Sequence, residues 1–305
     1  MPPSTLTSDL VTAIVVAFDS AHALPDCLTA LAGEGVRMVV VDNASSDASA
    51  NISIALGATL IRNARNEGYG RANNIGMAAV TTPYALIVNP DLVVGRGSVK
   101  ALLEAAGRWL DAALFAPRII EPSGRLFFQR RSLLAPDHLN QAHTLIVPEG
   151  DCCAPFLSGA CLLVRRDVFL GLHGFDEEVF LFYEDDDLCR RLRDAGNALV
   201  HVDMAEVHHA RGRSTRATPE RAFAARWHLA WSRAYMQAKY GLPSDAMAEC
   251  AINAMKAMGY GMLLNFGKAR RHAGSAAGAL AFLRHERALV REGLAASTLD
   301  ARRQA

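Results

Sequence analysis

Residues 11–17 read VTAIVVA, a fully apolar run apart from one threonine, and polar residues follow within two positions. The same design recurs along the first third of the chain, and its apolar runs are expected to be strands, at residues 11–17, 37–41 (RMVVV), 59–62 and 84–88 (YALIV). Helical apolar spacing lies between them, at residues 24–32 and 71–80. Short apolar strands alternating with helices predict βαβ units and a parallel sheet buried on both faces.

Three acidic residues stand just past the ends of predicted strands: Asp19, Asp42 and Asp91. In an open α/β sheet, ligands bind in the crevice at the carboxyl ends of the strands. Acids delivered there by three separate strands predict a functional site at that edge.

The length and the net charge of the chain limit which domain organisation and which partners are expected. The chain has 305 residues, of which 51% are hydrophobic, and its formal net charge is +1. One domain of about 200–250 residues with an appendage fits this length. The near-neutral charge provides no general field for nucleic acid, so no nucleic-acid partner is expected and any phosphate recognition must be local.

The six cysteines show no CxxC spacing, which is typical of reduced thiols in a cytosolic protein. The first nine residues lack the basic start and apolar centre of a signal peptide, and no run of 18 apolar residues occurs. We therefore expect a cytoplasmic protein.

The rest of the chain is less regular. Residues 118–155 are expected to be loop-rich, with antiparallel strands and a mobile loop; residues 157–165 read as a strand and residues 185–195 as a helix stopped by Gly196. From residue 221 the pattern is helical. The predicted organisation is a flexible N-terminus at residues 1–9, an α/β domain at residues 10–240 and a helical extension at residues 241–305.

Four motifs occur in order: VDNASSD at residues 41–47, NEGYGRANN at 66–74, NPD at 89–91 and EDDDLCRR at 184–191. Together they resemble glycosyltransferase family 2, and within it the rhamnosyltransferase-like members, over roughly residues 11 to 220. Three positions depart from the family pattern. The pair Phe18-Asp19 stands where Tyr-Asn is usual, and Asn89 replaces the first acid of an Asp-x-Asp motif.

The resemblance implies a GT-A fold: a Rossmann-like, mostly parallel sheet flanked by helices, here with a small helical C-terminal extension. It implies an inverting transfer of a sugar, with rhamnose the first candidate, from a nucleoside-diphosphate-sugar donor. The acceptor would be a hydroxyl of a glycan or lipid-linked glycan, as in cell-wall or polysaccharide biosynthesis.

Donor binding is expected at the strand ends. A carboxylate such as Asp42 can accept hydrogen bonds from a nucleobase or a ribose; the alternative is that it caps the next helix, which is the favoured interpretation for Asp47. Glycines allow close backbone approach to a diphosphate. The expected donor-binding set is Phe18, Asp19, Asp42, Asn66, Gly68, Arg71, Asn73, Asn89 and Asp91.

A divalent ion, Mg²⁺ or Mn²⁺, would bridge the donor phosphates and neutralise the leaving group. The resemblance makes Asp91 a ligand and favours His209 over His208 as a second one, on a loop closing over the donor. An ordinary turn is the alternative for the Asn-Pro-Asp sequence.

Beyond these histidines, Arg211, Arg213 and Ser214 are candidate diphosphate or acceptor contacts. An exposed basic loop explains the two arginines nearly as well.

The acidic run at residues 184–187 suits a helix N-terminus, which is the alternative to catalysis. Crowded carboxylates raise one another's pKa, and a raised pKa suits a general base. The resemblance places the base at Asp185 and an acceptor-holding group at Glu184. Asp187 would orient its neighbours or contact the acceptor, and Asp186 is expected to be solvated.

Met247, Ala251, Met255, Met258 and Met262 recur at helical spacing, which predicts core packing against the α/β domain. Because basic residues follow, an interfacial helix is the alternative. Peripheral contact with the inner face of a membrane and a homodimer are both left open.

Two rival functions remain. A sugar nucleotidyltransferase would carry a Gly-rich basic loop after the first strand, and residues 18–22 lack it. A catalytically inactive nucleotide-binding member of the family would fit the Asn89 departure but not the acidic run.

Overall fold

The computed structural model describes residues 7–128, 132–139, 148–209 and 218–294. These residues form two compact units. The first comprises residues up to 66, 71–175 and 185–216, and the second comprises residues 67–70, 176–184 and 217 onward.

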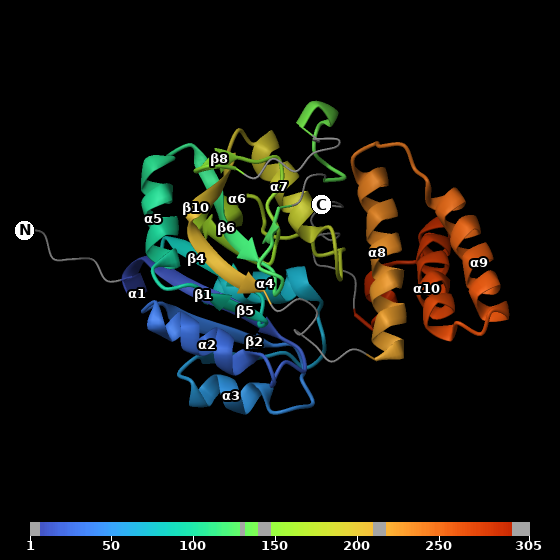
Figure 1. Cartoon of the computed structure of the whole chain (residues 1–305), viewed down its shortest axis with the longest axis horizontal. Helices are drawn as coiled ribbons and strands as arrows, with labels where there is room; N and C mark the ends of the chain where they lie inside the picture. The colour runs from blue at the N-terminus through green and yellow to red at the C-terminus, as the bar shows by residue number, and fades with distance from the viewer. Residues whose placement is uncertain (1–6, 129–131, 140–147, 210–217, 295–305) are drawn as a thin grey trace, which may run out of the picture. The chain divides into compact units, whose positions relative to one another are not determined.

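A mixed sheet forms the centre of the first unit (Figure 1). Its strands are β1 Val11–Ala17, β2 Arg37–Asp42, β3 Thr59–Arg62, β4 Tyr84–Val88, β5 Leu92–Val94, β6 Ala112–Ile120, β7 Leu126–Phe127, β8 Cys152–Cys153, β9 Cys161–Arg165 and β10 Ala198–His209. The main order is β3-β2-β1-β4-β9-β6-β10-β5. β3, β2, β1 and β4 are parallel, whereas β9 is antiparallel to both its neighbours and β5 is antiparallel to β10.

Helices flank this sheet and build the second unit. They are α1 Thr7–Leu10, α2 Leu24–Gly33, α3 Ser49–Ala55, α4 Tyr69–Ala78, α5 Ser98–Arg108, α6 Arg166–Gly171, α7 Glu184–Asp194, α8 Pro219–Lys239, α9 Ala246–Met262, α10 Phe266–Leu283 and α11 Ala288–Arg291. This is the GT-A type of architecture that the sequence predicts, with helices at the C-terminus.

The alternation of β1 explains the layers of the sheet. Every residue of β1 is buried. Ala13 and Val15 share a core with Leu28 of α2, whereas Ile14 faces Gly76 of α4, where an added Cβ would lie 2.6 Å from the isoleucine. Successive side chains of a strand point to opposite faces. An apolar strand without polar alternation therefore requires helices on both sides, and it has them.

The second half of the sheet differs from the sequence-based expectation. β10 is a twelve-residue strand that the sequence did not predict. Asp203 and Glu206 interrupt its apolar pattern, and both are only half-buried in the structure. The predicted strand at residues 157–165 is also shorter, because β9 begins only at Cys161.

The acidic start of α7 is mostly buried. The prediction that Asp186 is solvated is wrong: the side chain is buried, and Ser132 Oγ donates a hydrogen bond to its Oδ1. Burial raises the pKa of Asp186 to about 6 against the opposing effect of the Ser132 hydrogen bond, and the charge of Asp185 raises it further.

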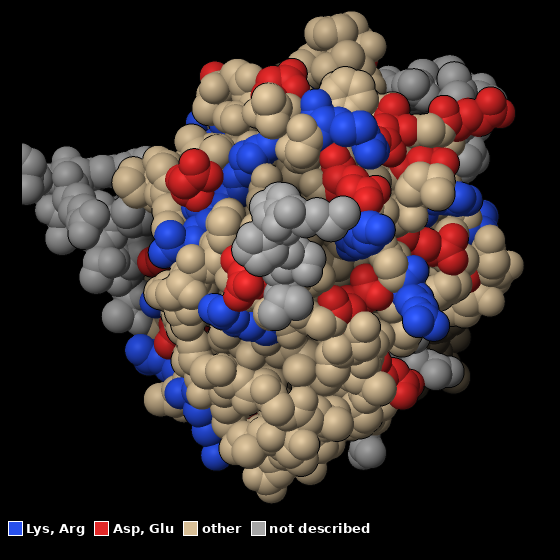
Figure 2. All heavy atoms as spheres, turned by 90° about the vertical axis from the view of Figure 1, so that its left-hand side faces the viewer, with Lys and Arg blue, Asp and Glu red and all other residues tan. Residues whose placement is uncertain are grey.

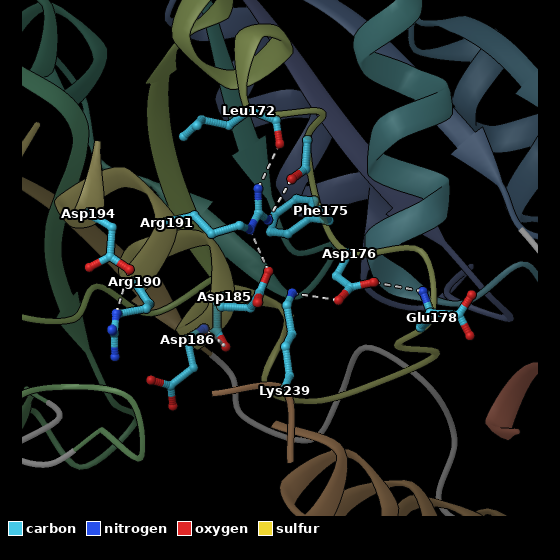
Figure 3. A network of polar contacts seen from close by, with 12 residues as sticks. Leu172, Phe175, Asp176, Glu178, Asp185, Asp186, Arg190, Arg191, Asp194 and Lys239 are labelled. Atoms are coloured by element: carbon cyan, nitrogen blue, oxygen red, sulfur yellow. Dashed lines mark hydrogen bonds and ion pairs between the residues drawn. The ribbon is translucent and has the colours of Figure 1, made fainter. Parts of the chain in front are cut away.

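Asp187 is fully buried and lies 2.7 Å from Nε of Arg191, one helical turn later. The same guanidinium donates to the backbone oxygens of Leu172 and Gly174, at 2.8 and 2.7 Å (Figure 3). Asp187 thus positions the arginine that holds the turn after α6, and its role toward the acceptor stays a prediction.

The second unit contains a layer of helices in which α10 packs against both α8 and α9. Glycines allow the α8–α10 approach: a Cβ on Gly278 would lie 2.1 Å from the Trp227 oxygen, and one on Gly274 would lie 2.5 Å from the Phe223 oxygen. α8 belongs to this unit; the predicted domain boundary at residue 240 stays a prediction.

The methionine stripe of α9 does not pack into a core. Met247, Met255, Met258 and Met262 are all exposed, and Ala246 is the buried residue of this helix. The expectation that the stripe packs against the α/β domain is therefore wrong. Within the described residues, no helix is long and apolar enough to cross a bilayer.

Charges of both signs are interspersed on the face of the molecule shown in Figure 2. No broad region of one sign covers that face, in line with the net charge of +1. Any electrostatic recognition there must come from single side chains.

We expect Gly278→Ala to destabilise the protein by about 1–3 kcal/mol, because the new methyl group overlaps the Trp227 carbonyl and forces α8 and α10 apart. Gly259→Ala in α9 is the matched control, since its Cβ would meet nothing within 4 Å. It should stabilise by up to about 1 kcal/mol through helix propensity. Thermal unfolding followed by circular dichroism measures both, and equal melting temperatures would contradict the close α8–α10 packing.

We expect Asp186→Asn to increase the free energy of unfolding at pH 8 by about 1–2 kcal/mol. The folded state binds the Asp186 proton more tightly than the unfolded chain, so the wild type loses stability as pH rises from about 4 to about 6. An asparagine stays neutral and still accepts from Ser132. The gain should vanish at pH 4. The exposed Asp194, which pairs with Arg190 at 2.6 Å, provides the control: Asp194→Asn should show no such pH dependence.

Candidate active site

The loops after β1 and β2 are joined by side-chain hydrogen bonds. Asp19 Oδ1 accepts from the Ser46 backbone N at 2.7 Å and from its hydroxyl at 3.0 Å. The Asp19 N donates to Ser45 Oγ at 3.0 Å. Asp19 adopts φ +50°, a left-handed conformation that aspartate tolerates better than most residues. Asp19 therefore fixes the shape of the predicted base-binding edge.

Asp42 ends β2 with its side chain fully buried. Its Oδ1 accepts from the Ser45 N at 3.1 Å, and its Oδ2 lies 3.2 Å from Nε of Arg62, at the end of β3. Asp47 accepts from the Ser49 N, the first residue of α3, at 2.9 Å, although the N-cap position itself is Ala48.

Amide side chains extend this edge toward β3. Asn43 Nδ2 donates to Asn66 Oδ1 at 2.8 Å, and Asn63 Nδ2 donates to Asn43 Oδ1 at 2.9 Å. Asn43 and Asn63 were not among the predicted site residues. The signal was present, because both directly follow the last residue of a strand.

Asn66 thus belongs to this edge of the sheet, whereas Gly68 and Tyr69 of the same motif contact Phe180. Gly68 has φ +84°, and an added Cβ would lie 2.4 Å from the Phe180 carbonyl, which accepts from the Tyr69 N at 3.0 Å. Close packing on Phe180 explains this glycine without a diphosphate. In α4, Arg71 is half-buried and Asn73 is fully buried.

Asp91 and His209 are brought together by strand pairing. β5 starts at Leu92, and β10 pairs with it so that His209 lies opposite Leu92. Asp91 Oδ1 is 3.4 Å from His209 Nε2, with the Asp91 side chain fully buried and that of His209 14% exposed. The expectation that His209 sits on a loop is wrong, since it is the last residue of β10.

The two neighbouring histidines have different environments because strand residues alternate between faces. His208 is 57% exposed and lies 3.0 Å from Glu206. His209 Nδ1 is buried and has no hydrogen-bond partner among the described residues. Of the two, His209 is the one placed beside the predicted metal-binding carboxylate.

Asp185 reaches the same edge of the sheet through the segment before β9. Its Oδ2 accepts from the Gly159 N at 2.8 Å, and the adjacent Ala160 O accepts from the Asn89 N at 2.9 Å. Two hydrogen bonds, one at Gly159 and one at Ala160, therefore connect Asp185 to the Asn89-Pro90-Asp91 turn. A Cβ on Gly159 would lie 3.0 Å from the Asp185 Cβ, so the glycine permits this approach.

Burial raises the pKa of Asp185, although hydrogen bonds from the Gly159 and Asp186 backbone oppose the shift. The residue as a whole is nevertheless partly exposed. A carboxylate that is more basic than usual is suited to take a proton. Glu184, the first residue of α7, is buried.

Asp91 and His209 suit a divalent ion in their chemistry. An oxygen and a nitrogen ligand at 3.4 Å separation are close to the spacing of about 3 Å between adjacent ligands of one octahedral ion. An imidazole favours Mn²⁺ over Mg²⁺. No group of three or more metal-binding side chains was found among the described residues, so donor phosphates and water would complete the shell.

Three predicted contacts, Arg211, Arg213 and Ser214, lie outside the described residues. Their roles stay predictions.

Sequence comparison finds relatives that are glycosyltransferases. The N-acetylglucosaminyl-diphospho-decaprenol L-rhamnosyltransferase of Mycobacterium tuberculosis is 31% identical over 221 residues, which cover 62% of this chain and 71% of that protein. The rhamnosyltransferase WbbL of Escherichia coli is 29% identical over 189 residues, covering 56% and 71%.

Solved structures share the fold. S. aureus TarS 1-349 in complex with UDP has a TM-score of 0.54 at 14% identity and covers 91% of this chain and 92% of its own. The mannosyltransferase PcManGT from Pyrobaculum calidifontis, in complex with GDP-Man and Mn²⁺, has a TM-score of 0.54 at 18% identity and covers 90% and 86%. At these identities the likeness concerns the fold.

The model of the family described as glycosyl transferase family 2 matches residues 12–171, more than half of the chain. That span contains the strand ends at Asp19, Asp42 and Asp91. The chain belongs to glycosyl transferase family 2, and it is a rhamnosyltransferase-like glycosyltransferase.

Proposed function

We propose that the protein transfers L-rhamnose, with inversion, from a nucleoside-diphosphate donor to a hydroxyl of a lipid-linked glycan. The observation that carries the proposal is the contact of Asp91 with His209, together with the hydrogen bonds that link Asp185, through Gly159 and Ala160, to the turn that contains Asp91. The rhamnosyltransferase relatives support the sugar, and the name of the mycobacterial relative supports a lipid-diphosphate acceptor. A thymidine diphosphate is the first candidate for the donor nucleotide.

Donor binding is assigned to the loops after β1, β2 and β3. The hydrogen bonds of Asp19 and Asp42 hold these loops in shape before any ligand arrives. Preorganised loops lose less freedom when a ligand binds. The Phe18 and Asn66 regions would frame the base and ribose.

The metal is assigned to Asp91 and His209. A bound Mn²⁺ or Mg²⁺ would supply positive charge to the departing diphosphate. Asn89, in place of an acid, leaves one fewer carboxylate, so metal and donor are expected to bind together. The neighbour solved with GDP-Man and Mn²⁺ supports a divalent ion.

Asp185 is assigned as the general base. It would accept the proton of the acceptor hydroxyl while the hydroxyl oxygen bonds to the anomeric carbon. The bond from that carbon to the diphosphate oxygen breaks at the same time, and its electron pair leaves with the nucleoside diphosphate. Attack opposite the leaving group inverts the configuration. Glu184, next to the base, would hold the acceptor.

We expect His209→Ala and Asp91→Asn to weaken Mn²⁺-dependent binding of thymidine diphosphate about tenfold or more. Calorimetric titration with and without Mn²⁺ measures this. His208→Ala is the matched control: its side chain is exposed beside Glu206, so binding should not change. Wild-type affinity in His209→Ala, or metal-independent binding in the wild type, would contradict the assigned ligands.

We expect Asp185→Asn to lower kcat by about 10²–10⁴ while leaving donor binding intact. The raised pKa predicts that wild-type activity falls as pH drops through a value above the ordinary range of aspartate, because the base becomes protonated. The amide variant should lose this acid limb. Release of nucleoside diphosphate from thymidine-diphosphate-rhamnose with acceptor measures the rate. Asp186→Asn should keep most activity. Unchanged turnover in Asp185→Asn would remove Asp185 as the base, and an inactive wild type that still binds donor would favour a nucleotide-binding role.

A further inference from the structure

One face of α9 is apolar and exposed. Helix α9 packs along α10 in the second unit, as Figure 1 shows. On its other side, Met255 and Met258 are each 60% exposed and Met262 is 83% exposed. Methionines repeated every three to four residues form one stripe of the helix. Most of the surface of these three side chains is not covered by the described residues, so the stripe offers an apolar surface to another partner.

The connection from α9 to α10 continues the stripe. Leu263, Leu264 and Phe266 are 77%, 74% and 65% exposed. Leu264 has φ +54°, which is unfavourable for a leucine, and Asn265 caps α10 by accepting from the Lys268 N at 3.2 Å. We call Met255, Met258, Met262, Leu263, Leu264 and Phe266 the hairpin surface. Large exposed apolar patches usually mark an interaction site.

The charged residues of the hairpin itself have one sign. Residues 250–285 contain no Asp or Glu. They contain five basic residues, all exposed: Lys256, Lys268, Arg270, Arg271 and Arg284. Arg270 approaches Glu220 of α8 at 3.8 Å, and Lys268 lies over the Tyr260 ring at 5.2 Å. Lys256 and Arg271 are exposed on the two helices that the tip connects, whereas Arg284 follows the far end of α10.

The apolar hairpin surface and the basic residues beside it together indicate which kind of partner binds there. Two copies meeting through the hairpin surface would bring like charges together, which opposes a homodimer. An apolar tip bordered by lysine and arginine matches an anionic bilayer, where the apolar side chains enter the acyl boundary and the cations meet lipid phosphates. Methionine side chains are flexible and fit the irregular interior of a lipid layer.

We propose that the hairpin surface docks the protein on anionic phospholipid membranes. The docking uses neither the donor site nor the metal, so it stands apart from the proposed reaction. It complements that reaction, because a lipid-linked acceptor is confined to a bilayer and a docked enzyme would meet it there. Apolar insertion and charge attraction act together, since either alone gives weak, reversible binding.

Co-sedimentation of the full-length protein with vesicles tests the proposal, without donor or metal. Vesicles containing phosphatidylglycerol should bind the protein, and pure phosphatidylcholine vesicles should bind it at least about fivefold more weakly. Raising the salt concentration should reduce binding to the anionic vesicles.

Variants separate the two components. Leu263→Ser with Phe266→Ser should lower the partition coefficient about tenfold or more, because two large side chains no longer enter the bilayer. Lys268→Gln with Arg271→Gln should lower it about fivefold for each charge removed. The matched controls are Leu110→Ser and Lys100→Gln, which change equally exposed residues near the two ends of α5. Both should bind like the wild type.

The proposal is overturned by absence of binding to anionic vesicles, or by binding that the hairpin variants leave unchanged. It is also overturned if sedimentation shows a dimer that Leu263→Ser with Phe266→Ser converts to a monomer without any vesicle binding. Calorimetric titration of the same variants with nucleoside diphosphate measures donor binding separately. A failure of membrane docking can therefore be told apart from a failure of the proposed catalytic function.

Discussion

The backbone hydrogen bond from Asn89 N to Ala160 O is 2.9 Å long and ties the end of β4 to the segment before β9. From that segment, Gly159 N reaches the carboxylate of Asp185 at 2.8 Å. Three residues beyond Asn89, Leu92 pairs with His209. Backbone pairing therefore positions the candidate metal ligands, Asp91 and His209, and the candidate base, Asp185. Hydrogen bonds between backbone groups hold a position more rigidly than contacts between side chains alone.

Burial then separates the acidic residues into different roles. Asp42 and Asp187 are fully buried next to arginines, which compensate their charge. Asp186 is buried with a hydroxyl partner and its pKa rises to about 6. Asp185 has backbone donors, a raised pKa and some exposure. A buried carboxylate needs a partner or a proton, so position along one helical turn is enough to make neighbouring aspartates chemically different.

The second unit is held together by helix packing. Small residues bring α10 against α8, and Trp227 and Trp231 join Leu289 in a core of their own. That core uses the inner faces of the helices and leaves the outer face of α9 apolar and exposed. A stripe of methionines can face the core or face away from it. The number of apolar residues does not reveal which of these occurs, because burial depends on where the partner helix lies.

Much of this protein can be derived from local sequence. β1, β3 and β4 occupy the predicted residues, because continuous apolar runs bounded by polar residues have few other structures available. The order of the motifs indicated the family, and the ends of the apolar runs indicated the strand-end positions of Asp19, Asp42 and Asp91. The tertiary structure alone decided that β10 is a strand, that His209 belongs to this strand and not to a loop, that Asp186 is buried and that the α9 methionines are exposed. Each of these depends on which distant segment packs alongside, and a polar residue that gains a buried partner looks in the sequence like one that faces water.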